Sequence, residues 1–224
     1  MLGSLPASAV YDGMQIPDST LPAVRKLQIG SGTCTCTVVG PRVVLTAGHC
    51  VDAAGGSASN LMVNGIKAKK FKAHPKWAKG AVDKAGFDVA LVAFKQDLPG
   101  TPMGLASKTP SVGDAVTVIG YGMSMPGAVN TVNVRRMGTN TVAQTDMGQI
   151  IVNREQYSSQ PIPLPGDSGS PLVDSESHVT GVCSQYLGPP AMSYYMAAYI
   201  DINDPEVRSG LREMAKDLGV SAPF

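Results

Sequence analysis

The sequence contains little charge and few aromatic side chains. Charged residues make up 16% of its 224 residues, aromatic residues make up 5%, and the formal net charge is +1. So small a net charge gives no reason to expect a polyanion such as nucleic acid as a partner. No apolar stretch approaches the roughly 18 residues that a membrane-spanning helix needs, so the sequence predicts no membrane partner either.

Glycine and proline are plentiful, with 25 and 17 residues respectively. This composition favours short strands joined by tight turns over a helical bundle. Runs rich in β-branched residues predict strands over 22–29, 35–39, 43–46, 67–73, 89–94, 115–120, 135–144, 149–153, 171–173, 178–184 and 196–202. The number of strands alone predicts an all-β sandwich or barrel, and the length fits one or two domains.

One segment near the end of the chain has the signals of a helix. Asp204 is a good N-cap, Pro205 suits the first helical position, and Gly219 can end the helix. The residues that share its apolar face are Val207, Leu211, Met214, Ala215 and Leu218. The sequence therefore predicts a single C-terminal helix after the strands.

Three short motifs follow one another along the chain. They are Thr46-Ala47-Gly48-His49-Cys50, Phe87-Asp88-Val89-Ala90-Leu91 and Gly166-Asp167-Ser168-Gly169-Ser170-Pro171-Leu172. A serine hydroxyl is a poor nucleophile unless a histidine takes its proton and a carboxylate orients that histidine. Asp88 lies between apolar residues, so its carboxylate should be partly buried and needs a partner such as a histidine N–H. We therefore predict His49 as the base, Asp88 as the orienting acid and Ser168 as the nucleophile.

The glycines around Ser168 let the backbone turn consecutive N–H groups toward one point. The amides of Gly166 and Ser168 are predicted to stabilise negative charge on a substrate oxygen. An α/β-hydrolase elbow is excluded, because it needs glycine where Ser170 stands and an acid followed by a histidine downstream. Only His178 follows, ten residues later.

We predict no catalytic role for the four cysteines or for the histidines other than His49. Cys34, Cys36, His49 and Cys50 do not have the spacing of common zinc sites, so no metal or other cofactor is predicted. Cys36 and Cys183 are expected to be small buried hydrophobic residues. His74 and His178 are expected to be solvated.

The three motifs, in this order, resemble the chymotrypsin/trypsin family of serine proteases, and the resemblance covers roughly residues 10–218. It implies two six-stranded antiparallel β-barrels and a C-terminal helix. The first barrel would span 10–105 and carry His49 and Asp88, the second would span 106–203 and carry Ser168, and the helix would span 204–219. The resemblance also implies a disulfide between Cys34 and Cys50.

The same resemblance implies where the substrate pocket lies. Ile162 would form its floor and the run Ser184-Gln185-Tyr186 one wall. Because the floor carries no acid, preference for a basic residue before the cut is not expected. Tyr186 stands where the family usually has glycine, so it would narrow the pocket.

Val10-Tyr11-Asp12-Gly13 resembles the start of the mature family members, whose freed amine pairs with the acid before the serine, here Asp167. Residues 1–9 would then be a propeptide, a signal remnant or an added leader, being too short for an intact secretory signal. While they remain attached, Asp167 is expected to turn elsewhere and the chain to be a precursor with little activity.

The predicted protein is a monomeric, secreted serine endopeptidase, extracellular or periplasmic, that acts on protein or peptide substrates and is open to protein inhibitors. The lack of an Asn-x-Ser/Thr acceptor favours a bacterial member of the family. The alternative is a protease-like binding or adhesion protein with the same fold and negligible turnover.

Overall fold

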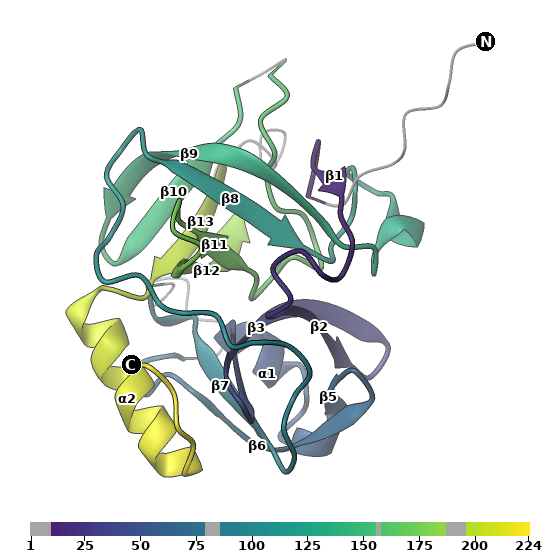
Figure 1. Cartoon of the computed structure of the whole chain (residues 1–224), viewed down its shortest axis with the longest axis vertical. Coiled ribbons are helices and arrows are strands. Elements are labelled where there is room, and N and C mark those ends of the chain that lie inside the picture. Colours follow the sequence, from purple (N-terminus) through teal and green to yellow (C-terminus); the bar gives the residue numbers. More distant parts are fainter. Residues whose placement is uncertain (1–9, 79–85, 156–157, 187–195) are drawn as a thin grey trace.

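The computed structural model describes residues 10–78, 86–155, 158–186 and 196–224 (Figure 1). This part of the chain contains strands β1–β13 and two α-helices, α1 and α2. The predicted leader, residues 1–9, lies outside the described residues. No helix within them is long and apolar enough to cross a membrane.

The first half of the chain forms a closed antiparallel barrel in the order β2-β3-β4-β7-β6-β5. Its strands are β2 (Val24–Ile29), β3 (Gly32–Gly40), β4 (Val43–Thr46), β5 (Leu61–Val63), β6 (Ile66–Ala73) and β7 (Ala90–Phe94). Every residue of β4 and β7 is buried; helix α2 (Pro205–Leu218) packs against β7, and a strand of the second barrel contacts β4. A barrel of this size is filled by its own side chains.

The second half forms another ring of six antiparallel strands, closed by the pairing of β8 with β9. Its strands are β8 (Ala115–Gly120), β9 (Arg136–Asp146), β10 (Gln149–Asn153), β11 (Pro171–Val173), β12 (Val179–Tyr186) and β13 (Met196–Asp201). The short β1 (Met14–Gln15) pairs with β9 outside the ring. The prediction of two six-stranded barrels is confirmed, while the domain boundary at residue 105 stays a prediction.

The C-terminal helix α2 (Pro205–Leu218) begins and ends as its sequence predicts. The Asp204 carboxylate accepts hydrogen bonds from two backbone N–H groups of the first turn, and Gly219 ends the helix in the left-handed conformation at φ 65°. The apolar face of α2 packs against β6 and β7. The helix thus follows the second barrel in sequence but covers the first (Figure 1).

His74 is buried, so the prediction that it is solvated is wrong. Its ring stacks on Phe87 at 4.9 Å between centroids, and its Nε2 lies 3.2 Å from the carbonyl oxygen of Glu206 in α2. Burial lowers the pKa of His74. The physical reason is that α2 lies over this turn, and such a contact leaves no local signal in the sequence. His178 is partly exposed.

Each of the eleven predicted runs overlaps an observed strand, but several short elements were not predicted. These are β1, β5, helix α1 (Gly48–Asp52) and the 3₁₀ turns Ala58–Asn60 and Val129–Thr131. The omission of β5 matters most, because its pairing with β2 closes the first barrel.

Candidate active site

His49 and Asp88 lie close together because they occupy the ends of neighbouring strands. His49 is in α1 immediately after β4, Asp88 precedes β7, and Thr46 pairs with Ala90 across these two strands. The Asp88 carboxylate lies 2.7 Å from Nδ1 of His49 through one oxygen and accepts the backbone N–H of His49 at 2.8 Å through the other. The imidazole is therefore held at Nδ1, which leaves its Nε2 for proton transfer.

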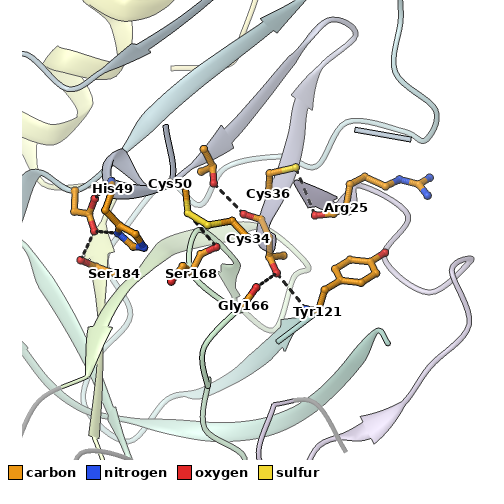
Figure 2. The surroundings of a disulfide bond; sticks show 12 residues. Arg25, Cys34, Cys36, His49, Cys50, Tyr121, Gly166, Ser168 and Ser184 are labelled. Atoms are coloured by element: carbon orange, nitrogen blue, oxygen red, sulfur yellow. Dashed lines mark hydrogen bonds and ion pairs between the residues drawn. A yellow bond between two sulfur atoms is a disulfide. The ribbon is translucent and has the colours of Figure 1, made fainter. Parts of the chain in front are cut away.

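The carboxylate of Asp88 has a third partner, from the second barrel. Ser184 in β12 donates its hydroxyl to Asp88 at 2.7 Å (Figure 2). The side chain of Asp88 is only 3% exposed whereas that of His49 is 37% exposed. A buried carboxylate needs such donors to remain charged. The sequence analysis assigned Ser184 to the pocket wall and missed this contact, for which the sequence offers no local signal.

The loop that carries Ser168 is fastened to the first barrel by Thr35 in β3. The backbone N–H of Thr35 donates to the carbonyl of Ser168 at 2.8 Å. Its hydroxyl donates to the carbonyl of Gly166 at 3.0 Å (Figure 2). The loop of Ser168 is thus bonded to the barrel that carries His49 and Asp88.

The backbone N–H groups of Gly166 and Ser168, the predicted oxyanion donors, lie in the loop that carries Ser168. The preceding carbonyls, of Pro165 and Asp167, each accept a backbone hydrogen bond at 2.9 Å. Because the C=O and N–H of a trans peptide group point in opposite directions, the two N–H groups face away from those bonds. Within the described part of the chain, neither N–H has a hydrogen-bond partner. Two unoccupied donors beside a serine can stabilise an oxyanion.

Two positions in this loop require glycine. Gly166 has φ 98°, and a Cβ there would lie 2.8 Å from the Cα of Gly122. Gly169 has φ 80°, and a Cβ there would meet the hydroxyl of Thr46 and lie 2.5 Å from the carbonyl oxygen of Thr35. A side chain at Gly169 would move the loop away from the first barrel, and one at Gly166 would collide with the segment that follows β8.

The carboxylate of Asp167 is fully buried and faces backbone donors. It accepts N–H groups from Gly122 at 2.7 Å and from Leu164 at 2.8 Å, and also the N–H of Val10. Burial raises the pKa of Asp167 to about 7, although these N–H groups and the charge of Arg136 act in the opposite direction. A large part of the carboxyl groups therefore holds a proton near neutral pH.

The expectation that Asp167 turns elsewhere while residues 1–9 are attached is wrong, because Asp167 and Val10 are already in contact in the whole chain. The next residue explains this arrangement. Tyr11 exchanges two backbone hydrogen bonds with Ile162, at 2.9 and 3.2 Å, and so holds the segment in place. The side chain of Val10 is fully buried in the core of the second barrel.

Arg154 holds the same segment from the side. Its guanidinium lies over the ring of Tyr11, 4.3 Å from the centroid, and is 2.6 Å from the carboxylate of Asp12. The segment that follows residue 10 is therefore fixed by main-chain bonds, a cation–π contact and an ion pair.

The residues predicted to line the substrate pocket are only partly described. Ile162 is fully buried in the core of the second barrel and brings no polar atom to this region. Gln185 is half-buried in β12. The side chain of Tyr186 and residues 187–195 lie outside the described residues.

The predicted disulfide between Cys34 and Cys50 is present, and it joins β3 to α1. Cys36 and Cys183 are free and buried as predicted, and burial raises the pKa of both thiols. Cys34, His49 and Cys50 have ligand atoms within 4.8 Å of one another. Because both sulfur atoms belong to the disulfide, this trio lacks the thiolates that zinc binds.

The two closed barrels with their C-terminal helix define the fold of the chymotrypsin-like serine proteases. The family model described as trypsin matches residues 10–205, and the chain therefore belongs to the trypsin family. Trypsin beta of Drosophila erecta is 28% identical over 200 residues, covering 78% of this chain and 76% of the relative. Scolexin B of Heliothis virescens is 30% identical over 190 residues, covering 68% and 65%.

Solved structures agree on the fold. Neuropsin, a serine protease expressed in the limbic system of mouse brain, aligns with a TM-score of 0.71 at 20% identity, covering 87% of this chain and 95% of neuropsin. A scabies mite inactivated protease paralogue aligns with a TM-score of 0.77 at 15% identity, covering 95% and 100%. At these identities the likeness shows the fold alone.

Asp167 should make the stability of the whole chain depend on pH. Its pKa rises from 3.8 to about 7 on burial, so the folded chain binds this proton more tightly than the unfolded chain. The stabilisation that this proton gives the folded chain is largest below pH 4, and the free energy of unfolding falls by a few kcal/mol as pH rises to 7. Urea unfolding should show this fall, and Asp167→Asn should flatten it. Parallel profiles for the two proteins would contradict the assignment.

Proposed function

We propose that this chain is a serine endopeptidase that cleaves protein or peptide substrates through an acyl-enzyme on Ser168. The observation that carries the proposal is the 2.7 Å contact between His49 Nδ1 and the buried carboxylate of Asp88. With Nδ1 so engaged, His49 would take the proton of Ser168 at Nε2 and return it to the leaving amine. The amides of Gly166 and Ser168 would stabilise the oxyanion, and this chemistry needs no cofactor.

The contact between Ser184 and Asp88 supports this assignment. During acylation His49 becomes an imidazolium, and a charged, immobile carboxylate stabilises it. The hydroxyl of Ser184 and the backbone N–H of His49 both donate to Asp88, so the carboxylate is held in one orientation.

A protease-like binding or adhesion protein with negligible turnover is the alternative. The fold does not decide between the two, because a structural neighbour of this chain is an inactivated protease paralogue. The open amides and the held imidazole favour turnover. Reaction with a fluorophosphonate probe separates the two functions, because it reports a competent serine whatever the substrate is.

Replacement of the nucleophile should remove hydrolysis and leave the fold intact. For Ser168→Ala we expect kcat to fall by about 10⁶, the loss seen when a related triad loses its serine. Hydrolysis of a peptide library and fluorophosphonate labelling measure the effect. Ser170→Ala is the control, because the hydroxyl of Ser170 is fully buried and should not itself react with the probe. This variant should therefore still be labelled at Ser168. A Ser168→Ala protein that kept a tenth of the turnover would rule out Ser168.

Cleavage should follow small or apolar residues and not Arg, Lys or Glu. Ile162 at the proposed floor of the pocket is apolar and fully buried, and an unpaired substrate charge beside it would lose its hydration. Sequencing the products of a mixed peptide library measures the preference. A basic or acidic residue that dominates the position before the cut would contradict this prediction.

We further propose that the protein is secreted to the extracellular space or periplasm, as a monomer, and made as a precursor. The disulfide supports an oxidising compartment, where such bonds persist. The N–H of Val10 at Asp167 supports cleavage before Val10, because a freed amine at this point would face the carboxylate with a full positive charge.

A protein that begins at Val10 should therefore be more active than the whole chain. Since the pKa of Asp167 is about 7 in the whole chain, more of its carboxyl groups are protonated at pH 6 than at pH 8. Because the free amine of the protein that begins at Val10 would keep Asp167 charged, the ratio of the two turnover rates should be larger at pH 6. Asp167→Asn in both proteins is the control and should abolish the difference. Equal turnover at both pH values would show that the free amine is not needed.

A further inference from the structure

A cleft of about 650 Å³ lies between the N-terminal segment and the first barrel, apart from the candidate active site. Its walls come from residues 15–18, β2, the turn between β5 and β6, and residues 133–135. None of His49, Asp88 and Ser168 lines it. The volume is within the range of small-molecule sites in proteins.

The cleft carries an excess of positive charge. Arg25, Lys26 and Arg135 line it, and the one carboxylate among the lining residues is that of Asp18, which is 76% exposed. The Asp18 carboxylate lies 3.9 Å from the guanidinium of Arg135, beyond hydrogen-bond distance. Two of the three cations therefore have no compensating carboxylate in the cleft.

Arg135 is the most deeply buried of these cations. Its side chain is 2% exposed, and its terminal nitrogens donate to the carbonyl oxygens of Asp18, Thr20 and Leu21. In the described part of the chain, its Nε has no hydrogen-bond partner, and neither has the buried Nε of Arg25. The hydrogen-bond acceptors of Arg135 are neutral carbonyl oxygens and its nearby carboxylate, that of Asp18, is largely exposed, so a bound anion would add to the compensation of its charge.

A neutral donor, the side-chain amide of Asn133, also lines the cleft. The amide of Asn133 uses its oxygen to accept the hydroxyl of Thr33, which leaves its NH₂ group to donate. The hydroxyl of Tyr121 lines the same space, but it donates its hydrogen to the carbonyl oxygen of Val24 at 3.5 Å. The NH₂ group of Asn133 suits a ligand that is rich in acceptor oxygens.

We propose that this cleft binds an oxyanion, the phosphate or sulfate group of a small polar molecule. The planar fork of arginine matches the geometry of phosphate and sulfate oxygens, and a lysine adds a point charge. The three cations exclude a cationic ligand, and the desolvation of their charges excludes an apolar one. A free phosphate ion would occupy only a small part of 650 Å³, so an ester of a small hydroxylated molecule fills the site better.

Calorimetric titration of the whole chain tests the site without relying on proteolysis. The probes are inorganic phosphate, sulfate and a hexose phosphate, each against sodium chloride of the same ionic strength. We expect saturable binding, a rise in Tm that follows ligand concentration, and a loss of about tenfold or more in affinity in the double variant R25Q/K26Q. K26Q alone should also weaken binding. Because Lys26 is only half-buried in its strand, this variant tests the proposal even if the double variant does not fold.

The double variant K69Q/K70Q is the matched control, because it removes two exposed lysines from β6 outside the cleft. Tighter binding of the hexose phosphate than of inorganic phosphate would identify an ester as the ligand, and equal affinity would identify the free ion. Binding no stronger than in the chloride control would overturn the proposal. So would an affinity unchanged by K26Q, or one reduced equally by K69Q/K70Q.

Discussion

The geometry of the candidate active site depends on the contact between strand β3 and the loop that carries Ser168. His49 and Asp88 belong to the first barrel and Ser168 to the second, so a small movement between the barrels would separate them. Thr35 binds two carbonyls of the loop, and the hydroxyl of Thr46 donates to the carbonyl of Thr35 at 2.9 Å. Gly169 lets the loop approach closely enough for these bonds to form.

The site contains two buried carboxylates, and the chain compensates them in different ways. Asp88 faces side-chain and backbone donors and contacts an imidazole that is open to solvent. Asp167 faces backbone N–H groups and the more distant charge of Arg136, which do not offset its desolvation, so its pKa rises to about 7. The carboxylate of Asp88 is thus fixed by several donors, while that of Asp167 responds to whatever charge comes near Val10.

The sequence predicts the features that are set by local chemistry. The caps of α2, the β-branched runs and the glycines around Ser168 depend on neighbouring residues, and the structure has the corresponding helix, strands and loop. Other features depend on distant partners. Leu61–Val63 is too short to be recognised as a strand until β2 and β6 flank it, His74 is covered by a helix about 130 residues later, and Ser184 is tied to Asp88 by the packing of two barrels. Patterns along the chain cannot show such contacts.

The segment after residue 10 is already fixed, and this would determine how the protein responds to a cut before Val10. Tyr11 is already bonded to Ile162, and Arg154 already holds Tyr11 and Asp12. A chain end created before Val10 would therefore not have to search for its site, since most of its conformational entropy is lost before the cut. It would behave as a ligand tethered at high effective concentration, and its response would be unimolecular, independent of how dilute the protein is.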